Sequence, residues 1–371
     1  MASSLFSGGK LVRSDLAERL LKALMKWDVP RFAHEVARLQ MLASLKYDQY
    51  GGYRPGVKFA ENLARWLEQF DEDERDVAFD FVMQRLVFIS EVEMHHLIEV
   101  AYPDVLEPRL LRRAAADLGY PSYRVQAIAG TLEFRALRRR TLFLGLSDGA
   151  RLDRLRRASG LSHEQFVQDY MIHDEQVDNV QEELRKALAK QDLPGEASFR
   201  QVVLVDDFSG SGRTLVRRDS ASERKGKLVR FAKELPRLTK AGFISEDAQI
   251  ALLLYVATEQ AVSHVGDTKA EFDMADWTID VVQQIAPELR VDNTDPEMVQ
   301  LCHAYYDPAT ADDHKGQTPI GYSQCALPLV LEHNTPNNSV CLLWAETGSG
   351  ELGAGRKALF PRYERHHRDR P

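Results

Sequence analysis

Two adjacent carboxylates and a loop of small polar residues follow an apolar run between residues 202 and 214. The run 202–205 consists of β-branched and aliphatic side chains, a pattern typical of a strand buried on both faces. Ligands of open α/β sheets bind outside the carboxyl ends of the strands. At that end Asp206 and Asp207 alternate in direction, so at least one carboxylate can accept hydrogen bonds from ligand hydroxyls. This order of groups suggests a sugar-phosphate site.

The loop behind the carboxylates has the composition of an anion site. Gly210 and Gly212 allow a close approach of the backbone or a positive φ, while N–H groups and hydroxyls can surround a phosphate. We therefore expect phosphate contacts from Ser209, Gly210, Ser211, Gly212, Arg213 and Thr214.

Two competing phosphate motifs do not fit this loop. No lysine follows Gly212, as a Walker A loop requires, and Leu215 stands where a dinucleotide fingerprint has its third glycine. The remaining alternative is an Asp-rich turn without a ligand. Two carboxylates beside a buried strand are costly without a partner, which favours the binding site.

A second anion site is expected after a strand at 141–146. Ser147 or Asp148 would cap the basic helix that follows at 152–157. A helix N-terminus just after a strand also binds anions, and Arg151 would supply a positive charge there. Plain capping of the helix is the alternative.

The elements that must position these groups change character at residue 140. Up to that point apolar residues recur at helical spacing, and one long helix is expected at 73–99. From residue 141 strands and helices alternate, with further strands at 248–257 and 277–282. We predict an α/β fold with a mainly parallel sheet flanked by helices, preceded by an all-α N-terminal domain. The predicted domains are 1–140 and 141–371.

Two features of the helical part allow more than one interpretation. The segment 105–140 is compatible with a small winged-helix-like unit, which could bind DNA. Its arginine clusters 109–113 and 135–140 could contact phosphates, form a partner surface or simply face solvent. His95 and Glu99 lie one helical turn apart, as metal ligands can, but no third ligand is evident.

Bulk composition is that of an ordinary intracellular protein. The chain has 371 residues and 44% hydrophobic content, enough for two domains with separate cores. A net charge of −8 argues against a dedicated nucleic-acid binder. Three cysteines without paired spacing indicate a reducing compartment, and the N-terminus has no apolar signal segment. We expect a cytoplasmic protein without membrane contact.

The segment 202–214 resembles the phosphoribosyl-diphosphate (PRPP) signature of type I phosphoribosyltransferases, in which four hydrophobic residues and two acidic residues precede a phosphate loop. The resemblance implies that Asp206 and Asp207 hold the ribose hydroxyls. It also implies Mg²⁺ as the cofactor, with Asp206 and Asp207 contributing to its site indirectly. It also implies that the loop after Asp207 binds the 5′-phosphate. The family's pyrophosphate loop corresponds here to Ser147, Asp148, Gly149 and Arg151.

A second polar block follows a strand-like run at 326–331. The sequence His333-Asn334-Thr335-Pro336-Asn337-Asn338 resembles a signature of phosphoribosyltransferase-like effectors of bacterial conflict systems, some of which occur beside retron reverse transcriptases. That resemblance covers about 141–362, includes the helix start at 226–228, and extends loosely to the helical part. It implies that His333 acts as a proton donor or base contact and that Asn334 and Asn337 contact the base. The alternative is a turn that satisfies its own backbone.

These patterns lead to one main functional hypothesis and two alternatives. The main hypothesis is a phosphoribosyltransferase-like protein that binds PRPP or a nucleotide and acts at ribose C1′, as an effector in bacterial defence. The second is an effector that cleaves N-glycosidic bonds of nucleotides. The third is a non-catalytic nucleotide sensor whose helical domain binds a defence-system protein.

Overall fold

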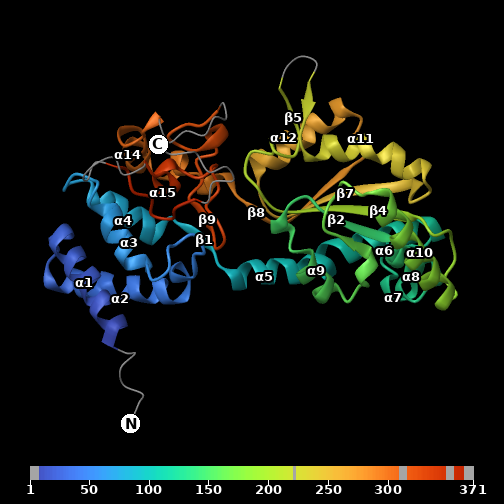
Figure 1. Cartoon of the computed structure of the whole chain (residues 1–371), viewed down its shortest axis with the longest axis horizontal. Helices are drawn as coiled ribbons and strands as arrows, with labels where there is room; N and C mark the ends of the chain where they lie inside the picture. The colour runs from blue at the N-terminus through green and yellow to red at the C-terminus, as the bar shows by residue number, and fades with distance from the viewer. Residues whose placement is uncertain (1–7, 220–222, 309–315, 348–354, 363–371) are drawn as a thin grey trace, which may run out of the picture. The chain divides into compact units, whose positions relative to one another are not determined.

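The computed structural model describes residues 8–219, 223–308, 316–347 and 355–362. The chain forms two compact units, which Figure 1 shows together. The first consists of residues 94–285 and contains the large sheet; we call it the sheet unit. The second combines residues 1–93 with 286–371, and we call it the split unit.

The sheet unit has the predicted α/β composition. Its helices are α6 (Glu107–Leu118), α7 (Val125–Ala129), α8 (Leu132–Arg139), α9 (Leu152–Ser159), α10 (Asp174–Lys190), α11 (Lys227–Lys240) and α12 (Glu259–Lys269). Its strands are β2 (Thr141–Gly145), β3 (Phe166–Val167), β4 (Phe199–Ser209), β5 (Arg217–Arg218), β6 (Arg224–Lys225), β7 (Ile244–Thr258) and β8 (Thr278–Ile285). Helix α5 (Glu91–Val100) and a π-helical turn (Ala101–Leu106) lead into this unit.

Five of these strands form one sheet in the order β3-β2-β4-β7-β8, and every neighbouring pair is parallel. The predicted parallel α/β fold is therefore confirmed. From β2 the chain continues outward to β3, whereas from β4 it continues to β7 on the other side. The direction of winding thus reverses between β2 and β4. In open α/β sheets this reversal point is where ligands bind.

Alternate residues of the strands pack against different helices. Leu142, Val202 and Ile250 lie side by side in register, and they join one core cluster with the apolar faces of α10 and α11. Figure 1 shows α11 and α12 on one face of the sheet and α9 on the other. Both faces of the central strand are therefore covered, which explains why its sequence is continuously apolar.

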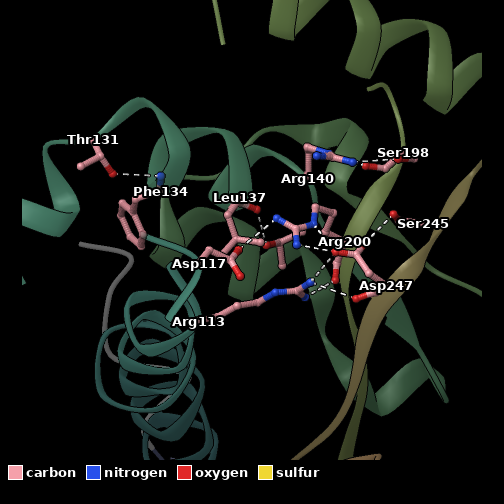
Figure 2. Close-up of polar contacts among 11 residues, drawn as sticks. Arg113, Asp117, Thr131, Phe134, Leu137, Arg140, Ser198, Arg200, Ser245 and Asp247 are labelled. Atoms are coloured by element: carbon pink, nitrogen blue, oxygen red, sulfur yellow. Dashed lines mark hydrogen bonds and ion pairs between the residues drawn. The ribbon is translucent and has the colours of Figure 1, made fainter. Parts of the chain in front are cut away.

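Helices α6 and α8 are fastened to the amino-terminal edge of the same sheet by buried arginines (Figure 2). Arg113 is 8% exposed and donates hydrogen bonds to the backbone carbonyls of Arg200 and Asp247, the latter at 3.0 Å. Arg140 is 9% exposed and donates to the carbonyl and hydroxyl oxygens of Ser198 at 2.7 and 2.8 Å. Arg200 in turn holds the pKa of Asp247 down at about 2. Each arginine thus ties a helix to the start of a strand.

Because these arginines tie α6 and α8 to the sheet, the helices before residue 140 pack with the strands that follow it. The compact units do not divide the chain there, because residues 94–140 belong to the sheet unit and residues 286–371 return to the N-terminal helices. The segment 105–140, all of which the structure describes, consists of α6, α7 and α8 with their connections and contains no strand that could form a wing.

The split unit is mainly helical. Its elements are α1 (Gly8–Met25), α2 (Val29–Leu45), α3 (Phe59–Leu67), α4 (Arg75–Gln84), β1 (Val87–Ile89), α13 (Val291–Thr294), α14 (Pro296–Ala304), β9 (Leu329–Leu331) and α15 (Cys341–Trp344). Strands β1 and β9 pair in parallel and bring the two chain segments together. The expected helix at 73–99 is therefore wrong in its middle, where Val87–Ile89 pairs with a partner distant in sequence.

Cys302, Cys325 and Cys341 are buried thiols. Within the described residues, none of the helices has the length and apolar character needed to cross a membrane.

Candidate functional site

The candidate site lies at the carboxyl end of β4, beside the point where the sheet reverses its winding. Asp206 and Asp207 occupy the end of this strand, and the carboxyl end of β2 lies next to it through the pair Gly145 and Val205. The neighbouring strand β7 contributes Tyr255 at the same level. The predicted residues thus follow two neighbouring parallel strands, and β7 adds Tyr255 at the same end of the sheet, as expected for a ligand site.

Asp206 is the more deeply buried of the two carboxylates, with 2% of its surface exposed. Its side chain points to the α11 side of the sheet. Its Oδ2 atom accepts a hydrogen bond from the Lys227 ammonium at 2.6 Å, and its Oδ1 atom accepts one from the Ser147 hydroxyl. Both carboxylate oxygens therefore already have partners from separate segments.

Burial raises the pKa of Asp206, while the Lys227 ammonium opposes this shift and the charge of Asp207 adds to it. A carboxyl whose folded pKa lies above its unfolded value of about 4 favours the folded state most when protonated. The contribution of Asp206 to stability is thus lost as the pH rises from about 4 through its raised pKa. Lys227 limits this loss because it stabilises the charged form.

Asp207 is half-buried and points to the opposite face of the sheet. A methyl group added at Gly149 would overlap its carboxylate, so the loop after β2 lies directly against it. On the same face Tyr255 is fully buried and donates a hydrogen bond to the Ala150 carbonyl at 2.9 Å. Burial, followed by the charge of Asp207, raises the pKa of Tyr255 and keeps it a neutral donor. Tyr255 therefore anchors the loop that packs on Asp207.

The loop 209–214 closes tightly behind the carboxylates. Gly212 has φ +71°, and an added Cβ would lie 2.9 Å from the Ala261 carbonyl, so this position requires glycine. The Thr258 hydroxyl donates to the Gly210 carbonyl at 2.5 Å. Ser209 is 3% exposed, and its hydroxyl has no hydrogen-bond partner within the described residues. A buried hydroxyl in this condition is costly and is consistent with a ligand contact.

The loop after β2 differs in detail from the prediction. The Ser147 hydroxyl bonds to Asp206 and does not cap a helix. Arg151 occupies the N-cap position of α9 with φ +44° and provides no side-chain cap either. The capping role expected for Ser147 or Asp148 is therefore wrong. Ser147 and Gly149 instead contact the acidic pair, whereas Asp148 is exposed.

The block 333–338 belongs to the split unit, whereas the acidic pair belongs to the sheet unit. His333 is half-buried, and its Nδ1 atom lies 2.8 Å from Oε2 of Glu332. Thr335 is fully buried, and its hydroxyl bonds to the Phe360 carbonyl at 3.0 Å. Thr335 and its neighbours thus hold the split unit together. The roles of His333, Asn334 and Asn337 toward a ligand stay predictions.

The protein groups of the described residues do not form a metal centre. They include no cluster of three or more His, Cys, Asp or Glu side chains suited to a metal ion, and this applies to the pair His95 and Glu99 as well. Both oxygens of Asp206 are engaged by Lys227 and Ser147. The site therefore does not fit a protein-bound Mg²⁺. An indirect effect of the acidic pair on magnesium, through oxygens of the ligand, remains a prediction.

Neither Lys227 nor Tyr255 stands in a sequence pattern that predicts a role in the site. The segment 226–228 contributes to the family resemblance, but a lysine at the first position of a helix carries no signal for a partner 21 residues earlier. Tyr255 lies inside an apolar run and is indistinguishable there from a core residue.

Comparison with known proteins gives one finding. The model of the PRTase-CE family matches residues 63–362. This match includes the acidic pair, the loop 209–214 and the block 333–338, and it spans parts of both compact units. No curated protein and no solved structure matches the chain.

Proposed function

This chain belongs to the PRTase-CE family, and from that membership we propose that it binds PRPP or the ribose 5-phosphate part of a nucleotide and acts at C1′ of the ribose. The observation that carries this proposal is the end of β4. There a carboxylate pair at the reversal point of a parallel sheet is followed by a tight glycine-containing loop. The buried Ser209 hydroxyl of this loop finds no hydrogen-bond partner among the residues that the structure describes.

The proposed contacts follow from the surroundings of each group. The loop 209–214 binds the 5′-phosphate through backbone N–H groups and the Ser209, Ser211 and Thr214 hydroxyls. The half-buried Asp207 accepts hydrogen bonds from the ribose hydroxyls. The loop 147–151 lies against Asp207 and contacts the group that leaves C1′, either pyrophosphate or a base.

The chemistry at C1′ requires stabilisation of developing positive charge. Breaking the C–O bond to pyrophosphate, or the C–N bond to a base, leaves an oxocarbenium-like sugar and a departing electron pair. The carboxylate of Asp207 near the ribose stabilises the sugar cation, and Arg151 is the charge partner of the leaving group. We further propose that the protein serves as an effector in bacterial defence, because its 333–338 block resembles that of such effectors.

Calorimetric titration of the full chain with PRPP and with ribose 5-phosphate tests the binding proposal. We expect both ligands to bind, and we expect binding to vanish when Asp206→Asn and Asp207→Asn are combined, with the circular dichroism spectrum retained. Asp153→Asn is the matched control, because this exposed carboxylate lies at the start of α9 outside the proposed contacts. Unchanged binding by the double variant would reject the proposal.

The fate of a bound nucleotide separates the remaining possibilities. Release of free base and ribose 5-phosphate without added PRPP would favour N-glycosidic cleavage over transfer. Binding without turnover, together with ligand-dependent capture of a partner, would favour a sensor. Mass spectrometry of small molecules that co-purify with the protein would identify the base.

A further inference from the structure

Lys227 places a positive charge inside the proposed site. Its ammonium lies 2.6 Å from Oδ2 of Asp206, and the exposed fractions of the two side chains are 18% and 3%. An ion pair with so little exposure is a fixed part of the structure, because separating the partners would leave a buried carboxylate uncompensated. The charge that this carboxylate would otherwise offer to a ligand is therefore already neutralised.

The position of Lys227 is fixed by the phosphate loop. Its backbone N–H donates to the Thr214 carbonyl at 3.1 Å, directly at the end of the loop 209–214. The preceding residue, Gly226, has φ +127°, and a Cβ there would overlap the Leu215 carbonyl. Only glycine fits this turn, so the chain enters α11 with Lys227 aimed at the acidic pair. The same backbone thus closes the phosphate loop and delivers the ammonium.

The second carboxylate has different surroundings. Asp207 points to the other face of the strand, against the Gly149 loop, whereas Lys227 and Ser147 both hold Asp206. The two acidic residues of the motif therefore have unequal roles. Asp206 is held by Lys227 and Ser147, whereas Asp207 lies against Gly149, on the face where the ribose contact is proposed.

We propose that Lys227 is a positioning residue whose ammonium supplies the positive charge that the acidic pair needs. A ribose 5-phosphate group then binds at residues 206–214 through Asp207, and this binding requires no divalent cation. This inference rests on the proposed function. It differs from the cofactor expected from the family resemblance, because the Lys227 ammonium already compensates the charge of Asp206.

The test measures the affinity of the full chain for ribose 5-phosphate by calorimetry, once with magnesium chloride and once with EDTA. This probe has no pyrophosphate that could itself require a metal. For the wild-type chain we expect affinities that agree within about twofold. For Lys227→Met we expect a loss of about tenfold or more in EDTA with partial recovery in magnesium, because Asp206 then lacks a counter-charge.

Two further variants keep the result interpretable if Lys227→Met does not fold. Asp206→Asn combined with Lys227→Met removes both charges together, and we expect it to fold and to bind ribose 5-phosphate equally well in EDTA and in magnesium. Lys225→Met is the matched control, since this neighbouring lysine is paired with Asp219 and Glu223 on the β5–β6 hairpin. It should leave both affinities unchanged.

Three outcomes would overturn the inference. A wild-type affinity that drops about tenfold in EDTA would show that a divalent cation is required. Loss of binding in the Asp206→Asn, Lys227→Met variant would show that Asp206 itself contacts the sugar. No binding by the wild-type chain in either buffer would overturn the proposed function together with the inference, whereas the first two outcomes leave that function standing.

Discussion

At the scale of single residues, Asp206 and Asp207 show how neighbours in sequence acquire different environments. Strand geometry sends their side chains to opposite faces, so Asp206 meets Lys227 and Ser147, whereas Asp207 meets Gly149. Burial raises the pKa of the first, and a lysine from a distant segment opposes this shift. A motif of two acidic residues therefore does not imply two equal ligand contacts.

Gly149 provides a test of the second environment. We expect Gly149→Ala to weaken ribose 5-phosphate binding by about tenfold or more, because the added methyl group overlaps the Asp207 carboxylate and must displace it. Gly266→Ala in α12 is the control, since a Cβ there meets nothing within 4 Å. It should leave affinity unchanged and stabilise the helix by about 0.5–1 kcal/mol. Equal affinities of the two variants would contradict the placement of Gly149 against Asp207.

At the scale of elements, the arginine clusters of α6 and α8 serve the fold. Their sequence suggested a basic surface, yet Arg113 and Arg140 are buried and Arg109 pairs with Asp280 at 2.5 Å. Guanidinium groups with several donors satisfy backbone carbonyls at the starts of β4 and β7. These helices are therefore part of the sheet unit.

The fastening of α6 can be measured through Arg113. We expect Arg113→Met to lower the free energy of unfolding by about 2 kcal/mol, since it leaves two strand-edge carbonyls without their charged donor. Urea unfolding followed by circular dichroism measures the difference. The neighbouring Arg112 is exposed, and Arg112→Met should change stability by less than about 0.5 kcal/mol. Similar losses in both variants would argue against the fastening role.

At the scale of the whole molecule, the two compact units have separate hydrophobic cores. The sheet unit is built around β2, β4 and β7, and the split unit around α3, α4 and the aromatic ring of Phe360. The chain leaves the split unit after residue 93 and returns to it at residue 286. The acidic pair and the loops 147–151 and 209–214 all belong to the sheet unit.

This division predicts that a ligand stabilises the two units unequally. Calorimetry should resolve two unfolding transitions, and ribose 5-phosphate at a concentration about a hundredfold above its dissociation constant should stabilise one of them by about 2.7 kcal/mol. Trp277 identifies that transition, because it packs in the core of the sheet unit while Trp27, Trp66 and Trp344 belong to the split unit. In Trp277→Phe the ligand-shifted transition should disappear from tryptophan fluorescence. A single transition shifted as a whole would contradict the prediction.

Local sequence patterns predicted much of the sheet unit. The apolar runs at 141–146 and 248–257 correspond to β2 and β7, and the segment 202–214 combines a buried strand with a glycine-dependent loop. These features depend on neighbouring residues, so the sequence shows them directly. The helix expected at 73–99 is wrong for the opposite reason, because β1 exists through its pairing with β9, more than 200 residues away.

The parallel α/β class, the acidic pair and the loop behind it could all be read from the amino-acid order, because strand burial, side-chain alternation and glycine conformations are local properties. Three further features emerged from the folded chain alone: Lys227 neutralises Asp206, Ser147 bonds to a carboxylate, and the block 333–338 belongs to a different compact unit. They depend on contacts between distant segments, and the free energy of such contacts leaves no periodic pattern along the chain.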